Sequence, residues 1–317
     1  MILYYNINIL YFTNNIKEYM EDNFKSGIVV LIARPNVGKS TLLNKFLGQK
    51  VAIATPLRQT TRKNLKGIYT DDNSQIVLID TPGVHKPLNE LGKYLSNQTM
   101  DALEDADLIL FLVDATQNAG LGDKWIYENY LKSTSTPILL VLNKVDLIKD
   151  LQARELNLFS YKQLFEKNID SIKISAKTGR NIDDLIKKIK TYLPLAPKFY
   201  EDDRLADTNM REIASEIIRE NIILNTKDEV PHSVAVIIDN YKEEEKIDKI
   251  SAKIIVNNDS QKGILIGKQG AMLKKIGTAS RKELEKMTEK KVFLELFVKV
   301  QKNWLKDKKA LKEFGYE

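Results

Sequence analysis

The chain has 317 residues, of which 43% are hydrophobic and 29% are charged, the ordinary balance of a folded globular protein. Its length favours two domains over one. It has no cysteine, which excludes disulfides, thiolate nucleophiles and Cys-type zinc sites, and its two histidines, His85 and His232, lie too far apart to favour a histidine-based metal site. No apolar run reaches the roughly 18 residues needed to cross a membrane. The lack of cysteine is typical of a reducing cytoplasm, where we expect the protein to act.

The positive charge of the chain is concentrated near its C-terminus. The formal net charge is +6. Residues 261–317 contain 15 Lys and Arg against 7 Asp and Glu, whereas the first 260 residues contain 34 against 36. This local excess predicts an anionic partner for the C-terminal region, with nucleic acid as the first interpretation and a membrane surface as the second.

Residues 1–24 differ in composition from the rest of the chain. They are rich in Ile, Tyr and Asn, and they lack the basic start and the small-residue cleavage site of a secretory signal. We interpret them as an N-terminal extension, with Met20 as a candidate for the true start. The alternative is an added edge strand or a membrane-contacting segment.

Residues 25–194 alternate apolar strands with helical segments. The strands lack polar alternation, which indicates burial on both faces, and strands separated by helices predict a doubly wound, mostly parallel α/β sheet. Ligands of such sheets bind at the carboxyl ends of the strands. The expected strands are Gly27–Ile32, Gln75–Ile79, Leu108–Val113, Ile138–Leu142 and Ile172–Ile174. The expected helices are about Lys39–Leu47, Leu91–Leu103, Trp125–Lys132 and Asp183–Tyr192.

A second, smaller unit follows a short linker. Two prolines close together in Leu193–Pro197 are typical of a stiff linker, which we place at residues 195–203. Residues 204–317 then have the order α-β-β-α-α-β, which predicts a small α+β domain. Its expected elements are the helix Met210–Leu224, the strands Ser233–Ile238, Ala252–Val256 and Val292–Val300, a hairpin loop at Tyr241–Lys249 and a Lys-rich helix that ends near Met287.

The stretch Ala33-Arg34-Pro35-Asn36-Val37-Gly38-Lys39-Ser40 lies between the first strand and the first helix. This is the context of a phosphate-binding loop, in which backbone N–H groups and a helix N-terminus cradle a polyphosphate. Lys39 would reach the β- and γ-phosphates, and Ser40 would offer its hydroxyl to Mg²⁺. The first position is Ala33, where the usual pattern has glycine, so a nucleotide site also depends on the other motifs.

Two further polar stretches are expected near this loop. Asp80-Thr81-Pro82-Gly83 follows the second core strand, where Asp80 can hold Mg²⁺ through water and the N–H of Gly83 can touch the γ-phosphate. Gln59-Thr60-Thr61-Arg62 lies in a polar loop, and one of its threonines can cap Mg²⁺ only when the γ-phosphate is present.

Asn143-Lys144-Val145-Asp146 indicates which base is bound. It follows the strand Ile138–Leu142, and an Asp there can accept from guanine N1–H and N2–H₂, a pair of contacts that adenine cannot match. Such a site discriminates strongly because the wrong base leaves polar groups unpaired. Ile174-Ser175-Ala176 would close the base pocket.

These motifs in this order resemble the translation-factor-related class of small GTPases, and Arg34–Ser40 with Gln59–Arg62 resembles the Era family in particular. In the second unit, Ile266-Gly267-Lys268-Gln269-Gly270 resembles the GxxG loop of a type II KH domain, and Lys274–Gly277 and Leu296–Val300 also resemble Era. The resemblance covers residues 25–317. It implies a P-loop GTPase domain joined to a KH domain, with GTP or GDP and Mg²⁺ as cofactors.

The resemblance implies a role for each matching residue. Mg²⁺ would be held by Ser40, Asp80 and Thr61, with Thr60 as the alternative to Thr61, and Lys39, Thr61, Asp80 and Gly83 would be catalytic. The nucleotide would be held by residues of all the motifs, which are Ala33, Arg34, Pro35, Asn36, Val37, Gly38, Lys39, Ser40, Asp80, Thr81, Pro82, Gly83, Val84, Asn143, Lys144, Val145, Asp146, Ser175 and Ala176.

The GxxG loop is expected after a strand and before a basic helix. Its glycines would let the backbone approach single-stranded RNA, and nearby lysines would neutralise phosphates. The implied RNA-binding residues are Ile266, Gly267, Lys268, Gln269, Gly270, Lys274 and Lys275, with Ile264, Leu265 and Ile266 as the floor of the groove. Trp304 could stack on a base, although half-buried packing is the commoner role of such a residue.

Hydrolysis is expected to be slow. In Ras-like enzymes a glutamine just after the DxxG motif orients the attacking water, and here that position is Val84, which cannot do so. In related GTPases an asparagine that matches Asn36 helps to bind a potassium ion, so potassium is a further expected cofactor. His85 is not expected to be the general base, since nothing nearby orients it.

The leading hypothesis is a slow GTPase that binds single-stranded small-subunit ribosomal RNA and acts, as a monomer, in small ribosomal subunit maturation. The ribosomal step comes from the resemblance alone. We expect the GTP form to bind RNA more tightly, with the linker Leu193–Pro197 transmitting the switch state. One alternative is a membrane-associated GTP switch whose basic C-terminal face contacts anionic lipid on the inner face of the cell membrane. The other, suggested by Ala33, is a hydrolysis-impaired RNA-binding protein.

Overall fold

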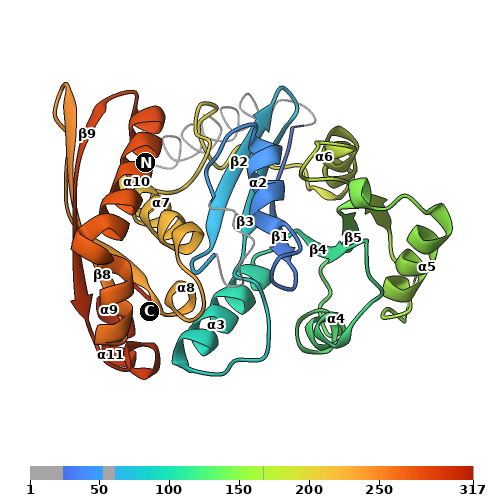
Figure 1. The fold of residues 1–317 in the computed structure, drawn as a ribbon. Helices are drawn as coiled ribbons and strands as arrows, with labels where there is room; N and C mark the ends of the chain where they lie inside the picture. Colours follow the sequence, from blue (N-terminus) through green and yellow to red (C-terminus); the bar gives the residue numbers. More distant parts are fainter. Residues whose placement is uncertain (1–23, 53–60, 167, 317) are drawn as a thin grey trace, which may run out of the picture.

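The structure, a computed structural model, describes residues 24–52, 61–166 and 168–316. Within them the chain forms a six-stranded and a three-stranded sheet, each covered by helices (Figure 1). Most of the expected N-terminal extension lies outside the described residues, as do Gln59 and Thr60. No helix in the described ranges is both long and apolar enough to span a bilayer.

The larger sheet has the strand order β2-β3-β1-β4-β5-β6. Neighbouring strands are parallel except β2 and β3, which are antiparallel. The predicted doubly wound, mostly parallel sheet is therefore confirmed, and all five expected strands occur in it. The strands are β1 (Lys25–Ile32), β2 (Leu65–Asp71), β3 (Ser74–Asp80), β4 (Leu108–Asp114), β5 (Ile138–Asn143) and β6 (Ser171–Lys173).

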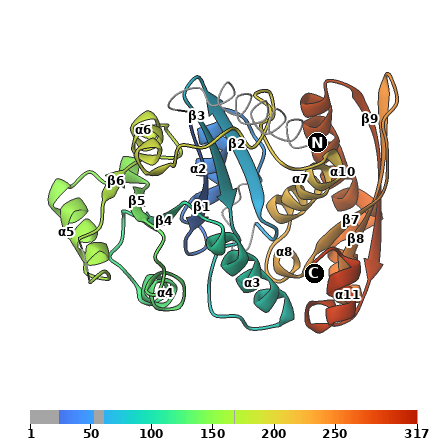
Figure 2. The same cartoon turned by 180° about the vertical axis from the view of Figure 1, so that it is seen from behind.

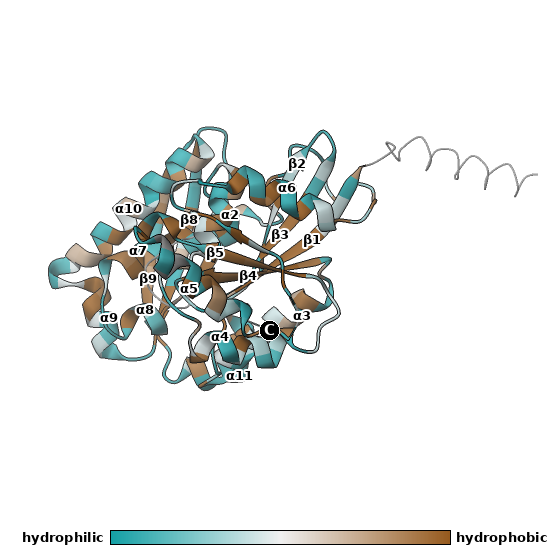
Figure 3. Ribbon diagram, turned by 90° about the vertical axis from the view of Figure 1, so that its right-hand side faces the viewer, coloured by the Kyte–Doolittle hydropathy of each residue, from teal (hydrophilic) through white to brown (hydrophobic). Residues whose placement is uncertain are grey.

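Both faces of this sheet are buried because successive apolar residues of its strands point to opposite sides. Val29 and Leu31 of β1 pack under α2 and α6, whereas Val30 and Ile32 pack under α3, α4 and α5. Figure 3 shows the outcome as brown strands between helices that are largely teal. The helices are α2 (Lys39–Leu47), α3 (Glu90–Glu104), α4 (Leu121–Ile126), α5 (Leu151–Lys162) and α6 (Ile182–Tyr192).

Two elements of this domain are absent from the sequence-based prediction. β2 is an edge strand that mixes a glycine and polar residues with apolar ones, so it lacks the apolar run of a buried strand. α5 exposes Leu156 and Phe159, which blurs its amphipathic pattern. In addition, the expected helix Trp125–Lys132 begins earlier, as α4, and continues as a π-helical turn at Tyr127–Leu131.

The smaller sheet has the order β7-β8-β9, with β7 antiparallel and β9 parallel to β8. The predicted order α-β-β-α-α-β is found, with the short helix α8 added. This domain lies beside β2 and α3 of the first one, as opposite views show (Figures 1 and 2). Its elements are α7 (Met210–Asn225), α8 (Val230–Ser233), β7 (Ala235–Lys242), β8 (Ile247–Val256), α9 (Asp259–Ile266), α10 (Ala271–Thr288), β9 (Lys291–Val300) and α11 (Lys308–Glu313).

Two expectations for this domain were wrong. The predicted hairpin loop Tyr241–Lys249 is mostly strand, because β7 and β8 extend into it and leave only residues 243–246 between them. The segment before the GxxG loop is the last turn of α9 and not a strand, so the loop joins two helices.

The segment between the domains is bound to the first domain at three places. Its backbone bonds to the start of β1, where Ser26 N donates to Pro194 O (3.3 Å), and to the edge strand β2, where Ile68 N donates to Leu205 O (2.9 Å) and Asp207 N to Lys66 O (2.9 Å). Between these two places, Phe199 N and Tyr200 N donate to the Gln75 side chain of β3. The expected linker is thus attached to the first domain before α7 begins.

Candidate functional site

The phosphate-binding loop leaves β1 and ends at the first turn of α2. Gly38 has φ = 107°, and a Cβ there would come within 2.5 Å of the side-chain nitrogen of Asn143, so glycine is required on both counts. Lys39 and Ser40 begin the helix and are buried, and no side chain caps its N-terminus. These first N–H groups are therefore available for an anion.

Ala33 is compatible with this loop. It is fully buried in the core cluster that contains Val29 and Leu31, and it is not among the described residues with positive φ. Its carbonyl oxygen accepts a 3.0 Å hydrogen bond from Val84 N. Because the backbone of Ala33 is not left-handed and its methyl group packs in the core, the position does not require glycine.

The three residues predicted to bind the metal converge. Ser40 Oγ donates to Asp80 Oδ2 at 2.7 Å, Thr61 Oγ1 donates to the same oxygen at 3.0 Å, and the two hydroxyls are 3.0 Å apart. They come from α2, from the segment that follows residue 60 and from the end of β3. Asp80 Oδ1 is buried and has no hydrogen-bond partner within the described part of the chain. Hydroxyl and carboxylate oxygens are the ligands that Mg²⁺ prefers, so this donor set fits that ion.

The site contains two buried charges of opposite sign. Burial lowers the pKa of the Lys39 ammonium, and the charge of Asp80 opposes that shift. Burial likewise raises the pKa of the Asp80 carboxyl, against the opposing effects of Lys39 and of the hydroxyls of Ser40 and Thr61. Lys39 and Asp80 thus depend on each other in the absence of a ligand.

The Asp80–Gly83 turn packs directly against the phosphate-binding loop. Thr81 Oγ1 donates to Leu31 O at 2.6 Å, and a Cβ on Gly83 would approach Pro35 Cα to 3.1 Å. Val84 is buried in the second core cluster. As expected from the sequence, this side chain cannot orient a water molecule.

Asn143 and Asp146 of the predicted base-binding motif have different surroundings. Asn143 Nδ2 donates to Val37 O at 2.8 Å, and its Oδ1 accepts from Ala176 N at 2.9 Å, so its polar atoms join the phosphate loop to the Ser175–Ala176 turn. Asp146 is exposed and available to a base. We therefore assign base contact to Asp146 and a positioning role to Asn143, which the sequence analysis had grouped together.

Lys144 is held by two partners. Its Nζ donates to Asn36 O at 2.8 Å and to Asp114 Oδ2 at 2.7 Å. Burial alone would raise the pKa of Asp114, but its bonds to Lys144 and Thr116 hold that pKa below the usual value. Asp114 was missed by the sequence analysis, although its position at the end of β4 could have indicated it.

Arg34 points away from the place where phosphates would lie. Its Nε forms a 2.8 Å ion pair with Asp123 Oδ1 on α4, and Asp123 Oδ2 also accepts from Gly120 N at 2.9 Å. The predicted nucleotide contact of Arg34 is therefore limited to its backbone, and the side chain fixes the loop to α4. No sequence motif marks Asp123.

The residue after Thr61 was also missed. Arg62 is 1% exposed, and its guanidinium donates to Val234 O at 2.6 Å and to His232 O at 3.1 Å in the second domain. Arg62 had been quoted as the last residue of the motif Gln59-Thr60-Thr61-Arg62, which carries part of the family resemblance, but no role was predicted for its side chain.

The GxxG loop has the backbone that its glycines predict. Gly267 and Gly270 have φ = 69° and 79°, and a Cβ on Gly267 would lie 2.8 Å from Met272 Cβ. The side chains of Lys268, Gln269, Lys274 and Lys275 are exposed. The groove floor is corrected in one respect, because Leu265 is fully buried in the core and cannot contact a base.

Burial decides the expectation for Trp304, and the structure shows one contact of His85. Trp304 is fully buried and donates from Nε1 to Ser233 O at 3.0 Å, so packing and not base stacking is its role. His85 Nδ1 lies 2.9 Å from Lys86 O, a local contact of its own loop.

Family models match two parts of the chain. A model described as 50S ribosome-binding GTPase matches residues 28–144, and a KH domain model matches residues 229–305. The chain is 47% identical over 300 residues to the GTPase Era of Geobacter metallireducens, covering 94% of this chain and 100% of that protein. It is 47% identical over 301 residues to the GTPase Era of Leuconostoc citreum, covering 93% and 98%.

Two solved structures share the whole architecture, each with a TM-score of 0.89, 37% identity and coverage of 92% of this chain and 99% of the other. One is Era in complex with MgGDPNP and nucleotides 1506–1542 of 16S ribosomal RNA. The other is a variant of Aquifex aeolicus Era bound to GDP and AlF₄⁻.

Proposed function

This chain belongs to the family of the GTPase Era, and we propose that it couples Mg²⁺-dependent GTP hydrolysis in the first domain to the binding of single-stranded small-subunit ribosomal RNA by the KH domain. The observation that carries the nucleotide half is the meeting of Ser40, Thr61 and Asp80 beside the start of α2. A relative solved with MgGDPNP and a segment of 16S ribosomal RNA supports both halves.

The residues of the first domain have distinct tasks in this reaction. Ser40, Thr61 and Asp80 would hold Mg²⁺, which when bound neutralises charge on the phosphate oxygens. Lys39 and the N–H groups at the start of α2 bind the polyphosphate. Asp146 selects guanine. Because Val84 is apolar and buried, no side chain at that position orients the attacking water, and we infer slow intrinsic turnover.

Potassium is a proposed further cofactor. Asn36 is exposed in the phosphate loop, at the position that matches the potassium-binding asparagine of related GTPases. A monovalent cation there would stabilise the transition state as an arginine finger does in other GTPases. GTP turnover should be faster in potassium than in sodium buffer at equal ionic strength. Equal turnover would remove potassium from the proposal.

We propose small-subunit assembly in the cytoplasm as the setting, with the protein acting as a monomer. The KH loop with its exposed Lys268, Lys274 and Lys275 supports contact with an RNA backbone. Affinity for RNA should fall steeply with salt, because bound lysines release counterions.

The decisive experiment is RNA-stimulated GTP hydrolysis. Replacing Gly267 and Gly270 with Asp places negative charge and a Cβ where the RNA backbone would approach, and should abolish stimulation while leaving hydrolysis without RNA unchanged. Gly263→Asp is the control, since it adds one negative charge on the neighbouring α9, where a Cβ meets no atom within 4 Å, and each single Asp variant of the loop is compared with it. Anionic vesicles replace RNA in a parallel series. Stimulation by vesicles alone, or undiminished RNA stimulation in the double variant, would contradict the proposal.

A further inference from the structure

Arg62 belongs to the first domain and directly follows Thr61, but its side chain is inserted into the second domain. The residue is 1% exposed. Two carbonyl oxygens, those of His232 and Val234, accept from the guanidinium, which also lies 5.9 Å from the ring centroid of Trp304. Tyr316 Oη lies at 3.5 Å. We call this set of His232, Val234, Trp304 and Tyr316 the Arg62 socket.

Thr61 and Arg62 are consecutive residues with opposite attachments. Thr61 Oγ1 contacts Ser40 and Asp80, the other two predicted Mg²⁺ ligands. The side chain of Arg62 instead bonds to the second domain. Adjacent Cα atoms are only about 3.8 Å apart, so neither residue can move far without the other. A buried guanidinium that lost its acceptors would be strongly destabilised, so Arg62 has two favourable states, fully inserted or withdrawn into water.

Two residues of the Arg62 socket, Trp304 and Tyr316, also pack near α3, the helix that follows the Asp80–Gly83 turn. Leu91 and Leu95 of α3 lie in the same buried cluster as Trp304 and Tyr316, and Tyr94 packs edge-on against Tyr316 at 5.8 Å between ring centroids. Trp304 and Tyr316, near the C-terminus, therefore contact Arg62, which follows Thr61, and α3, which follows Asp80 along the chain.

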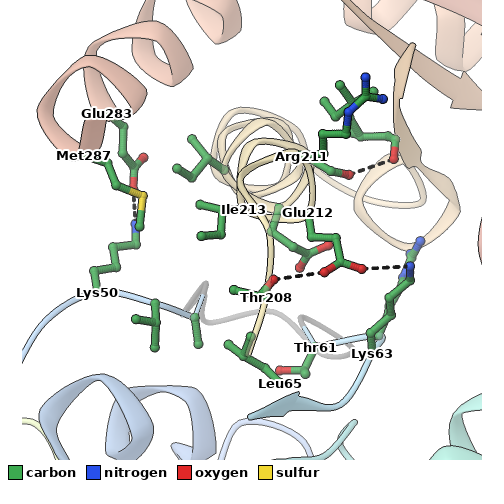
Figure 4. Close-up of a pocket in the computed structure, with 18 of the residues that line it drawn as sticks. Lys50, Thr61, Lys63, Leu65, Thr208, Arg211, Glu212, Ile213, Glu283 and Met287 are labelled. Carbon is green, nitrogen blue, oxygen red and sulfur yellow. Dashed lines mark hydrogen bonds and ion pairs between the residues drawn. The ribbon is translucent and has the colours of Figure 1, made fainter. Parts of the chain in front are cut away.

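Two lysines of the first domain, Lys50 and Lys63, form ion pairs with the second domain. Lys50 contacts Glu220 and Glu283 on α7 and α10. Lys63 lies 3.7 Å from Glu212 on α7. Figure 4 shows these two attachments on opposite sides of a cavity of about 1000 Å³ between the domains. The Lys63 pair is exposed on both sides and contributes little on its own. The Lys50 ammonium is half exposed although Glu220 is buried, so Arg62 is the one of these three attachments whose cation is itself buried.

The interdomain segment offers no comparable route. Its backbone hydrogen bonds run to β1 and β2 up to Asp207, so it moves with the first domain. The sequence-based hypothesis that Leu193–Pro197 transmits the switch state therefore has a better-placed alternative.

We propose that Arg62 is a positioning residue that couples two structural states. One is the placement of Thr61 beside Ser40 and Asp80, and the other is the orientation of the KH domain on the first domain. In this scheme the triphosphate and metal would stabilise Thr61 where it lies, beside Ser40 and Asp80, the insertion of Arg62 fixes the orientation of the KH domain, and RNA affinity changes accordingly. Linkage requires that RNA then favours the triphosphate by the same factor. The inference rests on the proposed function, since it concerns the path between its two halves.

The test measures RNA affinity of the full chain with a non-hydrolysable GTP analogue and with GDP, each with Mg²⁺. Arg62→Ala should bring the ratio of the two affinities close to one, and Arg62→Lys should restore part of it. Lys63→Ala is the matched control, because it removes only the neighbouring exposed ion pair, and it should keep the wild-type ratio. A wild-type ratio in Arg62→Ala, or a ratio near one in the wild type, overturns the inference, whereas absent GTP or RNA binding in the wild type would instead refute the proposed function.

A second readout separates positioning from a general loosening of the domain. The preference for the GTP analogue over GDP is measured without RNA for Thr61→Ala, Arg62→Ala and the double variant. If Arg62 acts through Thr61, each single variant should lose several-fold in preference and the double variant should lose no more than Thr61→Ala does. Additive losses would mean that Arg62 acts independently of Thr61, which contradicts the inference.

Discussion

Asn143 donates a 2.8 Å hydrogen bond to the carbonyl oxygen of Val37, and through this bond the strand that carries the base-binding motif holds the phosphate loop in shape. The same side chain accepts from Ala176 N. One amide group therefore joins three segments that are far apart in the sequence, and its effect on the nucleotide should be indirect.

Asn143→Ala is expected to destabilise the protein by about 2–4 kcal/mol, because it leaves two buried backbone groups without partners. GDP and GTP affinity should both fall, with the preference for guanine over adenine retained. Denaturant unfolding and nucleotide titrations check this. Asp146→Ala is the contrasting variant, which should lose base preference with little change in stability, since Asp146 is exposed. The reverse pattern would exchange the roles assigned here.

Ala33→Gly should not improve nucleotide binding. Ala33 is buried and free of backbone strain, so the change removes a packed methyl group and frees the unfolded chain. We expect a loss of about 1 kcal/mol in unfolding free energy and an unchanged GDP dissociation constant. A tenfold tighter complex would mean that Ala33 does impair the loop.

Without nucleotide and metal, Asp80→Asn should become more stable relative to the wild-type protein as the pH rises from below 3.8 towards neutrality, in addition to the cost of leaving the buried Lys39 ammonium without its counter-charge. Burial raises the pKa of Asp80 above 3.8, so the ionised carboxylate is less favourable in the folded state than in the unfolded state. This penalty is absent below pH 3.8, grows as the pH rises and is complete above the raised pKa. In chelator, the melting temperature of the variant minus that of the wild type should therefore be higher at pH 7 than below pH 3.8. With Mg²⁺ and GTP the variant should melt below the wild type, since it loses a ligand charge.

Arg34→Ala should be strongly destabilising without any direct loss of a phosphate contact. It leaves the Asp123 carboxylate, whose side chain is 0% exposed, without its cation, a situation that costs about 3 kcal/mol in buried pairs. Arg34→Met with Asp123→Asn should recover most of this loss, because the Asn side chain is neutral and can still accept from Gly120 N. Urea unfolding checks both, with Lys132→Ala as an exposed ion-pair control that should not change stability. No recovery in the double variant would argue against an isolated pair.

The features of this molecule that could be predicted from the sequence are those marked by residues close together along the chain. The segments that follow or end the strands β1, β3 and β5 and contain Lys39, Asp80 and Asp146 were predicted because apolar runs and polar motifs occur together within a few residues. The GxxG loop was found through its glycines, which have the positive φ that only such residues adopt easily.

The missed features depend on contacts between distant segments. Asp123 and Arg62 are single charged residues in ordinary surroundings, and only their partners, 89 and about 170 residues away along the chain, make them important. The misassignment of Ile264–Ile266 has a similar cause, because a short apolar run does not by itself distinguish a strand from the end of a buried helix.

The backbone pairing of residues 205–207 with β2 has a consequence for the GTPase domain on its own. β2 is the outermost strand of the larger sheet, and Leu205, Ala206 and Asp207 occupy hydrogen-bonding groups of its free side. Uncovered strand edges of this kind recruit strands from other molecules. A fragment that ends at residue 194 should therefore self-associate on concentration, whereas one that ends just after Asp207 should stay monomeric in light scattering, so the segment between the domains also serves as a guard against aggregation.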